Sequence, residues 1–240
     1  MSSSADNPLL KHSEEATATR AVFDAVWQSL ESSLGRGALL FPKEIFWLNG
    51  APGAGKGTHA ATIMEHRRYA GRPIVVSDLL QSPQARQLID SGKLVGDREV
   101  LELLLRKLLE PAFRNGAVVD GFPRTRVQVE CLRLLAARME TLRSESAGGF
   151  FAPDFHIFVL FVDEKESVNR QLQRGRETEQ AAGEVRKTDR DPELARKRHR
   201  IFMESTYEPL QTLRDIFQYH QVESYGAIPE VRQRIAAELG

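Results

Sequence analysis

The chain is poor in features that mark several large classes of protein. It contains one cysteine, Cys131, which excludes an intramolecular disulfide and a zinc site built from several cysteines. Its 33 basic residues are balanced by 33 acidic ones, which argues against general binding of nucleic acid or of a membrane surface. No apolar run is long enough to span a membrane. We therefore expect a soluble protein of a reducing compartment, the cytoplasm.

The start of the chain and the histidines are also informative by what they lack. The N-terminus lacks the basic segment followed by an apolar one that marks a signal peptide for export. Three acidic residues, Asp6, Glu14 and Glu15, argue against a mitochondrial transit peptide. The six histidines show no HExxH-like spacing, which argues against a zinc site. There is also no Gly-x-Ser-x-Gly segment for a serine nucleophile.

The N-terminal part of the chain predicts an extension to a larger domain. Residues 1–15 are polar and rich in serine, so we expect them to lack fixed structure. Across residues 16–34, apolar side chains recur at helical spacing and predict an amphipathic helix. This helix either docks on the main core or binds a partner or a second domain. We accordingly divide the chain into an extension, 1–40, and a main domain, 41–240.

A glycine-rich segment, residues 50–58, carries the strongest functional signal. It reads Gly-Ala-Pro-Gly-Ala-Gly-Lys-Gly-Thr and lies between an apolar run, 44–49, and a helix-like stretch, 58–68. Strand, glycine loop and helix in this order predict a phosphate-binding P-loop, in which backbone amides and the helix N-terminus surround a phosphate. The side chain of Lys56 would reach the outer phosphates. The predicted ATP-binding residues are Gly53, Ala54, Gly55, Lys56, Gly57 and Thr58.

The position of the hydroxyl group in this loop distinguishes between classes of P-loop protein. The general motif places Ser or Thr directly after the lysine, where the hydroxyl ligates Mg²⁺. Here Gly57 occupies that position, and Thr58 is turned about 100° further round the helix. We therefore expect Mg²⁺ to be held mainly by phosphates and water, with the carboxylates of Asp78 and Asp120 acting through water.

Alternating strand and helix signals predict the fold. Short β-rich runs are separated by helical segments such as 97–110, and near-continuous apolar strands of this kind form parallel sheets covered on both faces. We predict a three-layer α/β fold of the P-loop NTPase type, with a five-stranded parallel sheet. Its ligands would bind at the carboxyl ends of the strands. The predicted strands are residues 44–49, 73–77, 116–120, 155–162 and 220–224.

A second motif follows the third predicted strand, where residues 120–125 read Asp-Gly-Phe-Pro-Arg-Thr. Asp120 at a strand end can order water bound to Mg²⁺ beside the P-loop. Gly121 lets a ligand approach the backbone, and Arg124 offers a guanidinium fork for a phosphate. Taken alone, a turn of this composition can equally be structural.

Together, segments 50–58 and 120–125 resemble the adenylate kinases and related nucleoside monophosphate kinases. The resemblance extends over residues 43–240 and includes several motifs in the same order. It implies that Arg124 binds the phosphate of the acceptor nucleotide and that Gln128 hydrogen-bonds adenine. Kinases for UMP and CMP usually carry asparagines in this region, so Gln128 favours AMP.

The resemblance also covers the predicted lid. Arg170 and Arg174 are four residues apart and share one helix face; without a ligand, such arginines can simply be exposed to solvent. In the family the first arginine covers the base of ATP, the second contacts phosphates, and the next segment, here 175–189, is a lid. This lid contains no cysteine, so it is not of the zinc-binding type.

After the lid, the family places one arginine before a helix and a second arginine on that helix. Arg198 matches the second. The first falls on Lys187 when counted back from the helix and on Arg186 with a shift of one residue, and either would bring positive charge to the phosphates. Asp189 matches an aspartate of the family pattern, whereas Arg190 replaces the next one.

The main departure from the family lies in residues 76–81, Val-Ser-Asp-Leu-Leu-Gln. Gln81 replaces an arginine that grips the phosphate of AMP, and Val76 replaces a threonine that faces its base. Loss of one charged hydrogen bond costs about 1.5–3 kcal/mol. Arg86 is placed to compensate in part, and Val95 matches a residue that contacts the base.

These residues lead to one preferred hypothesis and two alternatives. The preferred function is reversible, Mg²⁺-dependent phosphoryl transfer from ATP to AMP by a monomer, with residues 78–108 and the lid closing over the substrates. The alternatives are a kinase for another acceptor, such as UMP or CMP, and a nucleotide-binding regulatory module with weak catalysis. The expected catalytic residues are Lys56, Arg124, Arg170, Arg174 and Arg198. The expected acceptor-binding residues are Val76, Gln81, Val95, Gly121, Arg124, Gln128, Lys187 and Arg198.

Overall fold

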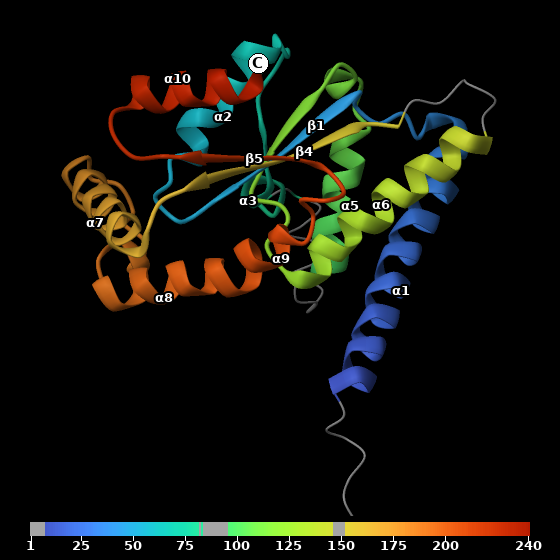
Figure 1. Cartoon of the computed structure of the whole chain (residues 1–240), viewed down its shortest axis with the longest axis horizontal. Coiled ribbons are helices and arrows are strands. Elements are labelled where there is room, and N and C mark those ends of the chain that lie inside the picture. Colours follow the sequence, from blue (N-terminus) through green and yellow to red (C-terminus); the bar gives the residue numbers. More distant parts are fainter. Residues whose placement is uncertain (1–7, 82, 84–95, 146–151) are drawn as a thin grey trace, which may run out of the picture.

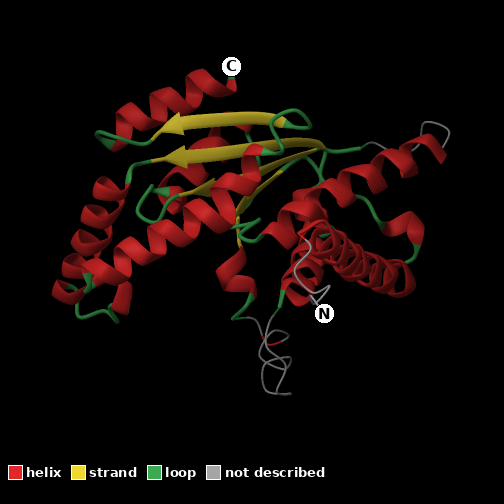
Figure 2. Ribbon diagram, turned by 60° about the horizontal axis from the view of Figure 1, so that its bottom comes forward, coloured by secondary structure: helices red, strands yellow, loops and turns green. Residues whose placement is uncertain are grey.

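A five-stranded, all-parallel sheet in the order β2-β3-β1-β4-β5 forms the centre of the molecule. The computed structural model describes residues 8–81, 83, 96–145 and 152–240, with backbone alone for residues 8–13. The predicted sheet with helices on both faces is confirmed (Figures 1 and 2). The strands are β1 Glu44–Gly50, β2 Ile74–Val75, β3 Ala117–Asp120, β4 Asp154–Phe161 and β5 Gln218–Glu223.

The helices alternate with these strands along the chain. They are α1 Pro8–Leu34, α2 Lys56–Arg67, α3 Val76–Leu79, α5 Asp97–Leu108, α6 Arg126–Glu145, α7 Glu164–Gln180, α8 Pro192–Phe202, α9 Glu208–Gln211 and α10 Ile228–Leu239. Among the helices of the described ranges, none combines the length and the apolar character that a membrane span requires.

Two hydrophobic cores lie on opposite faces of the sheet, and β1 contributes to both. Its side chains alternate, so that Ile45 and Trp47 enter the core formed with α1, α5 and α6. Phe46 and Leu48 enter the core formed with α2 and α10. A strand that is buried on both faces reads as a continuous apolar run, which explains the sequence of β1.

Helix α1 is docked on the first core. It lies along α5 and α6 on their side away from the sheet (Figure 1). Trp27 is 1% exposed, and its ring stacks between those of Phe23 and Phe41, with centroid distances of 6.1 and 6.2 Å. The side chain of Ser29 donates a hydrogen bond of 2.9 Å to Glu102 of α5. Of the two roles predicted for this helix, packing on the main core is the one that the structure shows.

Two predicted boundaries are wrong. Helix α1 begins at Pro8, so residues 8–15 are not without structure, since a helix once nucleated extends through residues of fair helix propensity. The strand predicted at 73–77 is only Ile74–Val75, because its neighbour β3 ends at Asp120, which pairs with Val75. With no partner beyond that point, the chain turns into α3 at Val76.

The docking of α1 leads to a first prediction. Replacing Trp27 by alanine should lower the free energy of unfolding by about 3–5 kcal/mol, because it removes a fully buried ring from the first core. Leu34 lies at the end of the same helix and is 43% exposed, so Leu34→Ala should cost less than about 1 kcal/mol. Urea denaturation of both variants measures the difference. Equal, small losses would show that α1 contributes little to the core.

A histidine pair, buried His156 and partly buried His220, lies across β4 and β5, on the side covered by α2 and α10. The ring of His156 stacks on Phe46 at 4.3 Å, and its Nδ1 lies 3.0 Å from Nε2 of His220. Its Nε2 lies 2.9 Å from a carboxylate oxygen of Glu44. Burial, together with the positive charge on His220 and Arg67, lowers the pKa of His156 to about 4.

The depressed pKa of His156 predicts how stability depends on pH. The unfolded state takes up a proton near pH 6.5 and the folded state only near pH 4, so this contribution is complete above pH 6.5 and is lost as the pH falls towards 4. The full difference amounts to about 3–3.5 kcal/mol of unfolding free energy. Urea denaturation at pH 7.5 and at pH 5 gives the loss of unfolding free energy between the two pH values. This loss should be smaller in His156→Phe than in the wild type. His66→Gln, on the exposed side of α2, should keep the wild-type pH effect; the same slope in both variants would contradict the assignment.

Candidate active site

The loop between β1 and α2 has the backbone shape that its glycines predict. Gly53 and Gly55 both adopt left-handed backbone geometry, with φ of 79°. A Cβ atom on Gly53 would lie 3.1 Å from the Cβ of Arg170 and from the carbonyl oxygen of Ser167, both on α7. The loop therefore packs directly on α7 and leaves no space for a side chain there. Ala54 is buried beneath the loop, whereas Gly57 and Thr58 are exposed on the first turn of α2.

Three polar side chains that the motif does not reveal hold this loop and its surroundings. The hydroxyl of Ser167 donates to the carbonyl oxygen of Pro52 at 2.7 Å, and that of Ser224 to the carbonyl oxygen of Ala54 at 2.8 Å. The amide of Asn49 donates to the carbonyl oxygen of Phe122 at 3.0 Å. Asn49 and Ser224 lie at the carboxyl ends of β1 and β5, and this position is the signal in the sequence that could have identified them.

Lys56 lies at the centre of a group of positive charges. Its ammonium group donates to the carbonyl oxygens of Gly50 at 2.8 Å and of Ala51 at 3.3 Å. Burial lowers its pKa to about 8; Asp120 opposes this shift, and three arginines add to it, namely Arg124, Arg198 and Arg174. Lysine and arginines predicted from separate parts of the sequence therefore act on one another electrostatically at the end of the sheet.

Asp120 supplies the buried negative charge beside Lys56. Burial raises the pKa of its carboxyl group, Lys56 and Arg124 lower it, and the neighbouring charge of Asp78 raises it. The two predicted carboxylates thus lie in the same electrostatic environment. Carboxylate oxygens suit Mg²⁺, but two of them do not complete its octahedron, so the cation fits here only together with phosphate and water oxygens. No cluster of three or more potential metal ligands occurs in the part of the chain that the structure describes.

Arg174 is fixed by a buried carboxylate. Asp189 is 5% exposed and accepts two hydrogen bonds from the guanidinium group of Arg174, at 2.8 and 2.7 Å. Burial alone would raise the pKa of Asp189, but the bonds and charge of Arg174 outweigh it, so this pKa is lowered. Arg198 of α8 lies 3.8 Å from the same carboxylate. Asp189, which matches an aspartate of the family pattern, therefore joins α7 and α8 through ion pairs with Arg174 and Arg198.

The structure brings Arg186 into this group. Its charge lowers the pKa of both Asp189 and Arg198. Lys187 begins the short 3-10 turn Lys187–Asp189 that follows. Arg186 thus acts electrostatically on Arg198, and the assignment of the phosphate contact to Arg186 or to Lys187 stays a prediction.

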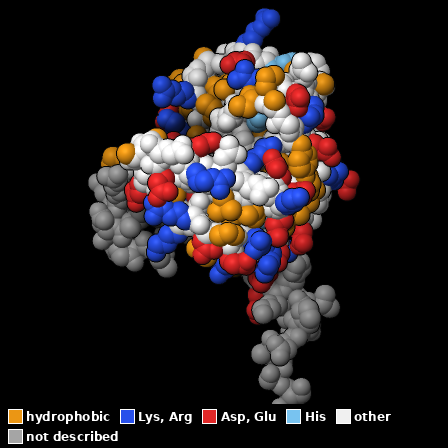
Figure 3. Space-filling model, turned by 90° about the vertical axis from the view of Figure 1, so that its left-hand side faces the viewer, with side chains coloured by type: hydrophobic (Ala, Val, Ile, Leu, Met, Phe, Trp, Pro, Cys, Tyr) orange, Lys and Arg blue, Asp and Glu red, His pale blue; other side chains and the backbone are white. Residues whose placement is uncertain are grey.

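The two remaining predicted arginines contact the backbone of the two motifs. Arg170 donates to Glu166 at 2.6 Å and lies 3.5 Å from the carbonyl oxygen of Gly53, against the P-loop. Arg124 donates from Nε to the carbonyl oxygen of Gly121 at 2.8 Å, so its guanidinium group is folded over that glycine. The strands β4 and β5 point towards the same end of the molecule (Figure 1). Figure 3 faces this end and shows Lys and Arg side chains interspersed with Asp and Glu.

The predicted acceptor residues differ in their exposure and surroundings. Gln128 is 6% exposed, at the start of α6, and its side chain is bonded to the backbone of Arg124. Val76 is buried in the first core, and Gln81 is exposed in the turn after α3. Val95 and Arg86 lie outside the described residues.

Comparison with known proteins identifies the family. A family model described as an AAA domain matches residues 49–187. The adenylate kinase of Xanthobacter autotrophicus is 30% identical over 202 residues, which cover 80% of this chain and 96% of that protein. The chain belongs to the adenylate kinase family of P-loop kinases. The adenylate kinase of Deinococcus deserti is 31% identical over 195 residues, 78% of this chain and 91% of its own.

One solved structure, a gluconokinase from Sinorhizobium meliloti 1021, aligns with 83% of this chain and 92% of its own length. Its sequence is 21% identical and the TM-score is 0.44.

The packing of the P-loop predicts different outcomes for two glycines of the same motif. Gly53→Ala should lower the free energy of unfolding by about 1–3 kcal/mol, because alanine is strained at this φ and its methyl group would press on α7. Gly57 has a helical backbone and open space around it, so Gly57→Ala should be neutral or stabilise by up to about 1 kcal/mol. Thermal and urea unfolding without nucleotide test the pair. Equal stabilities would mean that the loop does not pack on α7 as described.

Proposed function

We propose that the protein is an adenylate kinase that transfers the terminal phosphoryl group of ATP reversibly to AMP, giving two molecules of ADP. The observation that carries the proposal is the electrostatic group formed by Lys56, Arg124, Arg174 and Arg198 beside the P-loop. Cations brought together in a partly buried site repel one another, and a polyphosphate compensates this cost. The transferred phosphoryl group spreads its charge over several oxygens, which such a group neutralises.

The donor side is built by the P-loop and α7. The amides of residues 53–58 and the ammonium group of Lys56 would bind the outer phosphates of ATP. Arg170 lies against the loop, where it can cover the nucleotide, and Arg174 would contact phosphates. Mg²⁺ would be held through water by Asp120 and Asp78, and when bound it neutralises phosphate charge.

The acceptor side is formed by Arg124, Arg198 and Arg186, which would hold the phosphate of AMP in line with that of ATP. Gln128 would contact the base, and Gly121 allows the nucleotide to approach the backbone. The chemistry then requires positioning and charge neutralisation, with no covalent intermediate on the enzyme. All of these groups come from one chain, so we propose that the enzyme acts as a monomer, in the cytoplasm.

The lid would be the segment around residues 175–189, and the acceptor-binding part residues 78–108. Helix α7 continues to Gln180, so the first part of this lid is an extension of the helix that carries Arg170 and Arg174. Closure of both parts would exclude water, which otherwise competes with AMP for the phosphoryl group.

A different acceptor is the second candidate, and the surroundings of α3 favour it. Gln81 offers no positive charge for the acceptor phosphate, and the side chain of Val76 is packed in the first core. An enzyme of this kind would use another nucleoside monophosphate, such as CMP or UMP. The remaining alternative, a nucleotide-binding regulatory module with weak catalysis, would bind ATP but turn it over slowly.

A coupled assay for ADP formed from MgATP and AMP tests the proposal. The wild type should be active, and Lys56→Ala should lower kcat by about 100-fold or more, because it removes a charge that faces the transferred group. Lys165→Ala is a matched control, since this lysine is exposed on the outer side of α7. Faster turnover of CMP or UMP than of AMP would establish the second candidate. ATP binding without formation of ADP from any monophosphate would overturn the proposal.

A further inference from the structure

The side chain of Gln128 is held by hydrogen bonds at both ends of its amide. Its Oε1 accepts from the backbone N–H of Arg124 at 2.8 Å, and its Nε2 donates to Oδ1 of Asp97 at 2.7 Å. The hydroxyl of Thr125 donates to the same oxygen of Asp97 at 3.0 Å and accepts from the backbone N–H of Gln128 at 3.1 Å. Asp97, the first residue of α5, is therefore the centre of a closed set of bonds around a buried amide.

This arrangement fixes which way the amide points. Rotation of the amide by half a turn would place its oxygen against the carboxylate of Asp97 and its NH₂ group against the N–H of Arg124. Both contacts would be repulsive, because an acceptor would meet an acceptor and a donor would meet a donor. In the fixed orientation, Gln128 retains one N–H on Nε2 and one lone pair on Oε1 for a ligand. The positions of this donor and this acceptor cannot be exchanged.

We propose that Asp97 is a positioning residue that determines the specificity for the acceptor base by fixing the orientation of Gln128. This inference rests on the proposed function, in which Gln128 contacts that base. An amide held in one orientation pairs with a base edge that presents an exocyclic amino group beside a ring nitrogen acceptor. A 6-oxo base presents an acceptor and a ring N–H in the same places, and pairing with it requires the amide to rotate.

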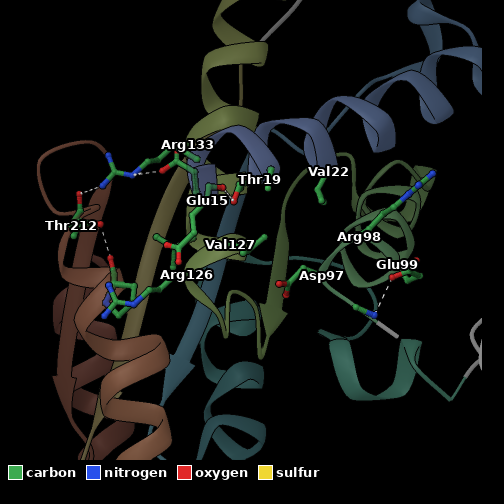
Figure 4. Close-up of a pocket in the computed structure, with 16 residues that line it drawn as sticks. Glu15, Thr19, Val22, Asp97, Arg98, Glu99, Arg126, Val127, Arg133 and Thr212 are labelled. Atoms are coloured by element: carbon green, nitrogen blue, oxygen red, sulfur yellow. Dashed lines mark hydrogen bonds and ion pairs between the residues drawn. The ribbon is translucent and has the colours of Figure 1, made fainter. Parts of the chain in front are cut away.

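A cavity beside Asp97 makes substitutions at this position practical. It has a volume of about 620 Å³ and lies between α1, the start of α5 and the start of α6. Its walls include Val22 of α1 and Val127 of α6, on either side of Asp97 (Figure 4). A side chain one methylene longer than aspartate therefore has space to adjust without displacing the core.

The test compares AMP with inosine monophosphate, which differs from it only at the amino-bearing edge of the base. The wild type should prefer AMP in kcat/KM by about 100-fold or more. In Asp97→Asn this preference should fall about tenfold or more, mainly through KM, because asparagine can present either an oxygen or an NH₂ group to Gln128. The kcat with AMP should change less than about threefold, since the phosphate-binding groups are untouched.

Asp97→Glu serves as the conservative variant. Asparagine is closer to aspartate in shape, but glutamate keeps the carboxylate, so Asp97→Glu should retain more of the preference for AMP than Asp97→Asn. A merely structural role predicts the reverse order. Thermal unfolding of both variants establishes that they are folded.

The outcomes separate this inference from the proposed function. A wild type that makes no ADP from AMP refutes the proposed function and this inference with it. A wild type that is active on AMP but does not discriminate against inosine monophosphate refutes the inference alone. So does an unchanged preference in Asp97→Asn, or a greater loss in Asp97→Glu than in Asp97→Asn.

Discussion

Repulsion between cations at the carboxyl end of the sheet is the constraint on which the rest of the structure depends. Burial lowers the pKa of Lys56 to about 8, and the charges of Arg124, Arg198 and Arg174 add to this shift. Like charges in the same site repel one another and move apart unless hydrogen bonds or ion pairs hold each side chain in place. Arg174 is bonded to buried Asp189, Arg124 to the carbonyl oxygen of Gly121, and Lys56 to that of Gly50. The site is thus an arrangement of cations that the backbone and buried carboxylates hold in place before any phosphate binds.

The topology of the sheet brings these groups to the same place. β1 is the central strand, and its neighbours β3 and β4 lie on either side of it, which creates the point at which ligands bind in open parallel sheets. In the pairing of β1 with β3, Leu48 lies opposite Asp120, so the carboxylate ends up beside the start of the P-loop. Burial of β1 on both faces makes this register rigid, because a shift by one residue would exchange its two apolar faces. The hydrophobic cores therefore determine the distance between the proposed metal-binding carboxylate and the lysine.

The sequence predicts the parts of the molecule that are encoded locally. The P-loop, Asp120 at the end of its strand, and the shared helix face of Arg170 and Arg174 all follow from spacing within a short segment. The short strand β2 does not, because its length is set by where β3 ends. Nor do the contacts of Asp97 with Gln128 and of Ser167 with the P-loop, since each joins segments that are separate in sequence. Such contacts depend on packing angles that no local pattern specifies.

The acceptor side differs from the donor side in how it is supported. The donor groups rest on the sheet and on α7, whereas Asp97 rests on α5, and α5 rests on α1. The bond from Ser29 to Glu102 joins α1 and α5, and Arg106 of α5 donates to both of these residues. Helix α5 thus connects the two sets of bonds, because it is held by α1 through Glu102 and Arg106 and carries Asp97, the partner of Gln128, at its start. Because an amide is oriented only as firmly as its partner is held, helix α1 contributes to the rigidity of the wall that faces the proposed acceptor base.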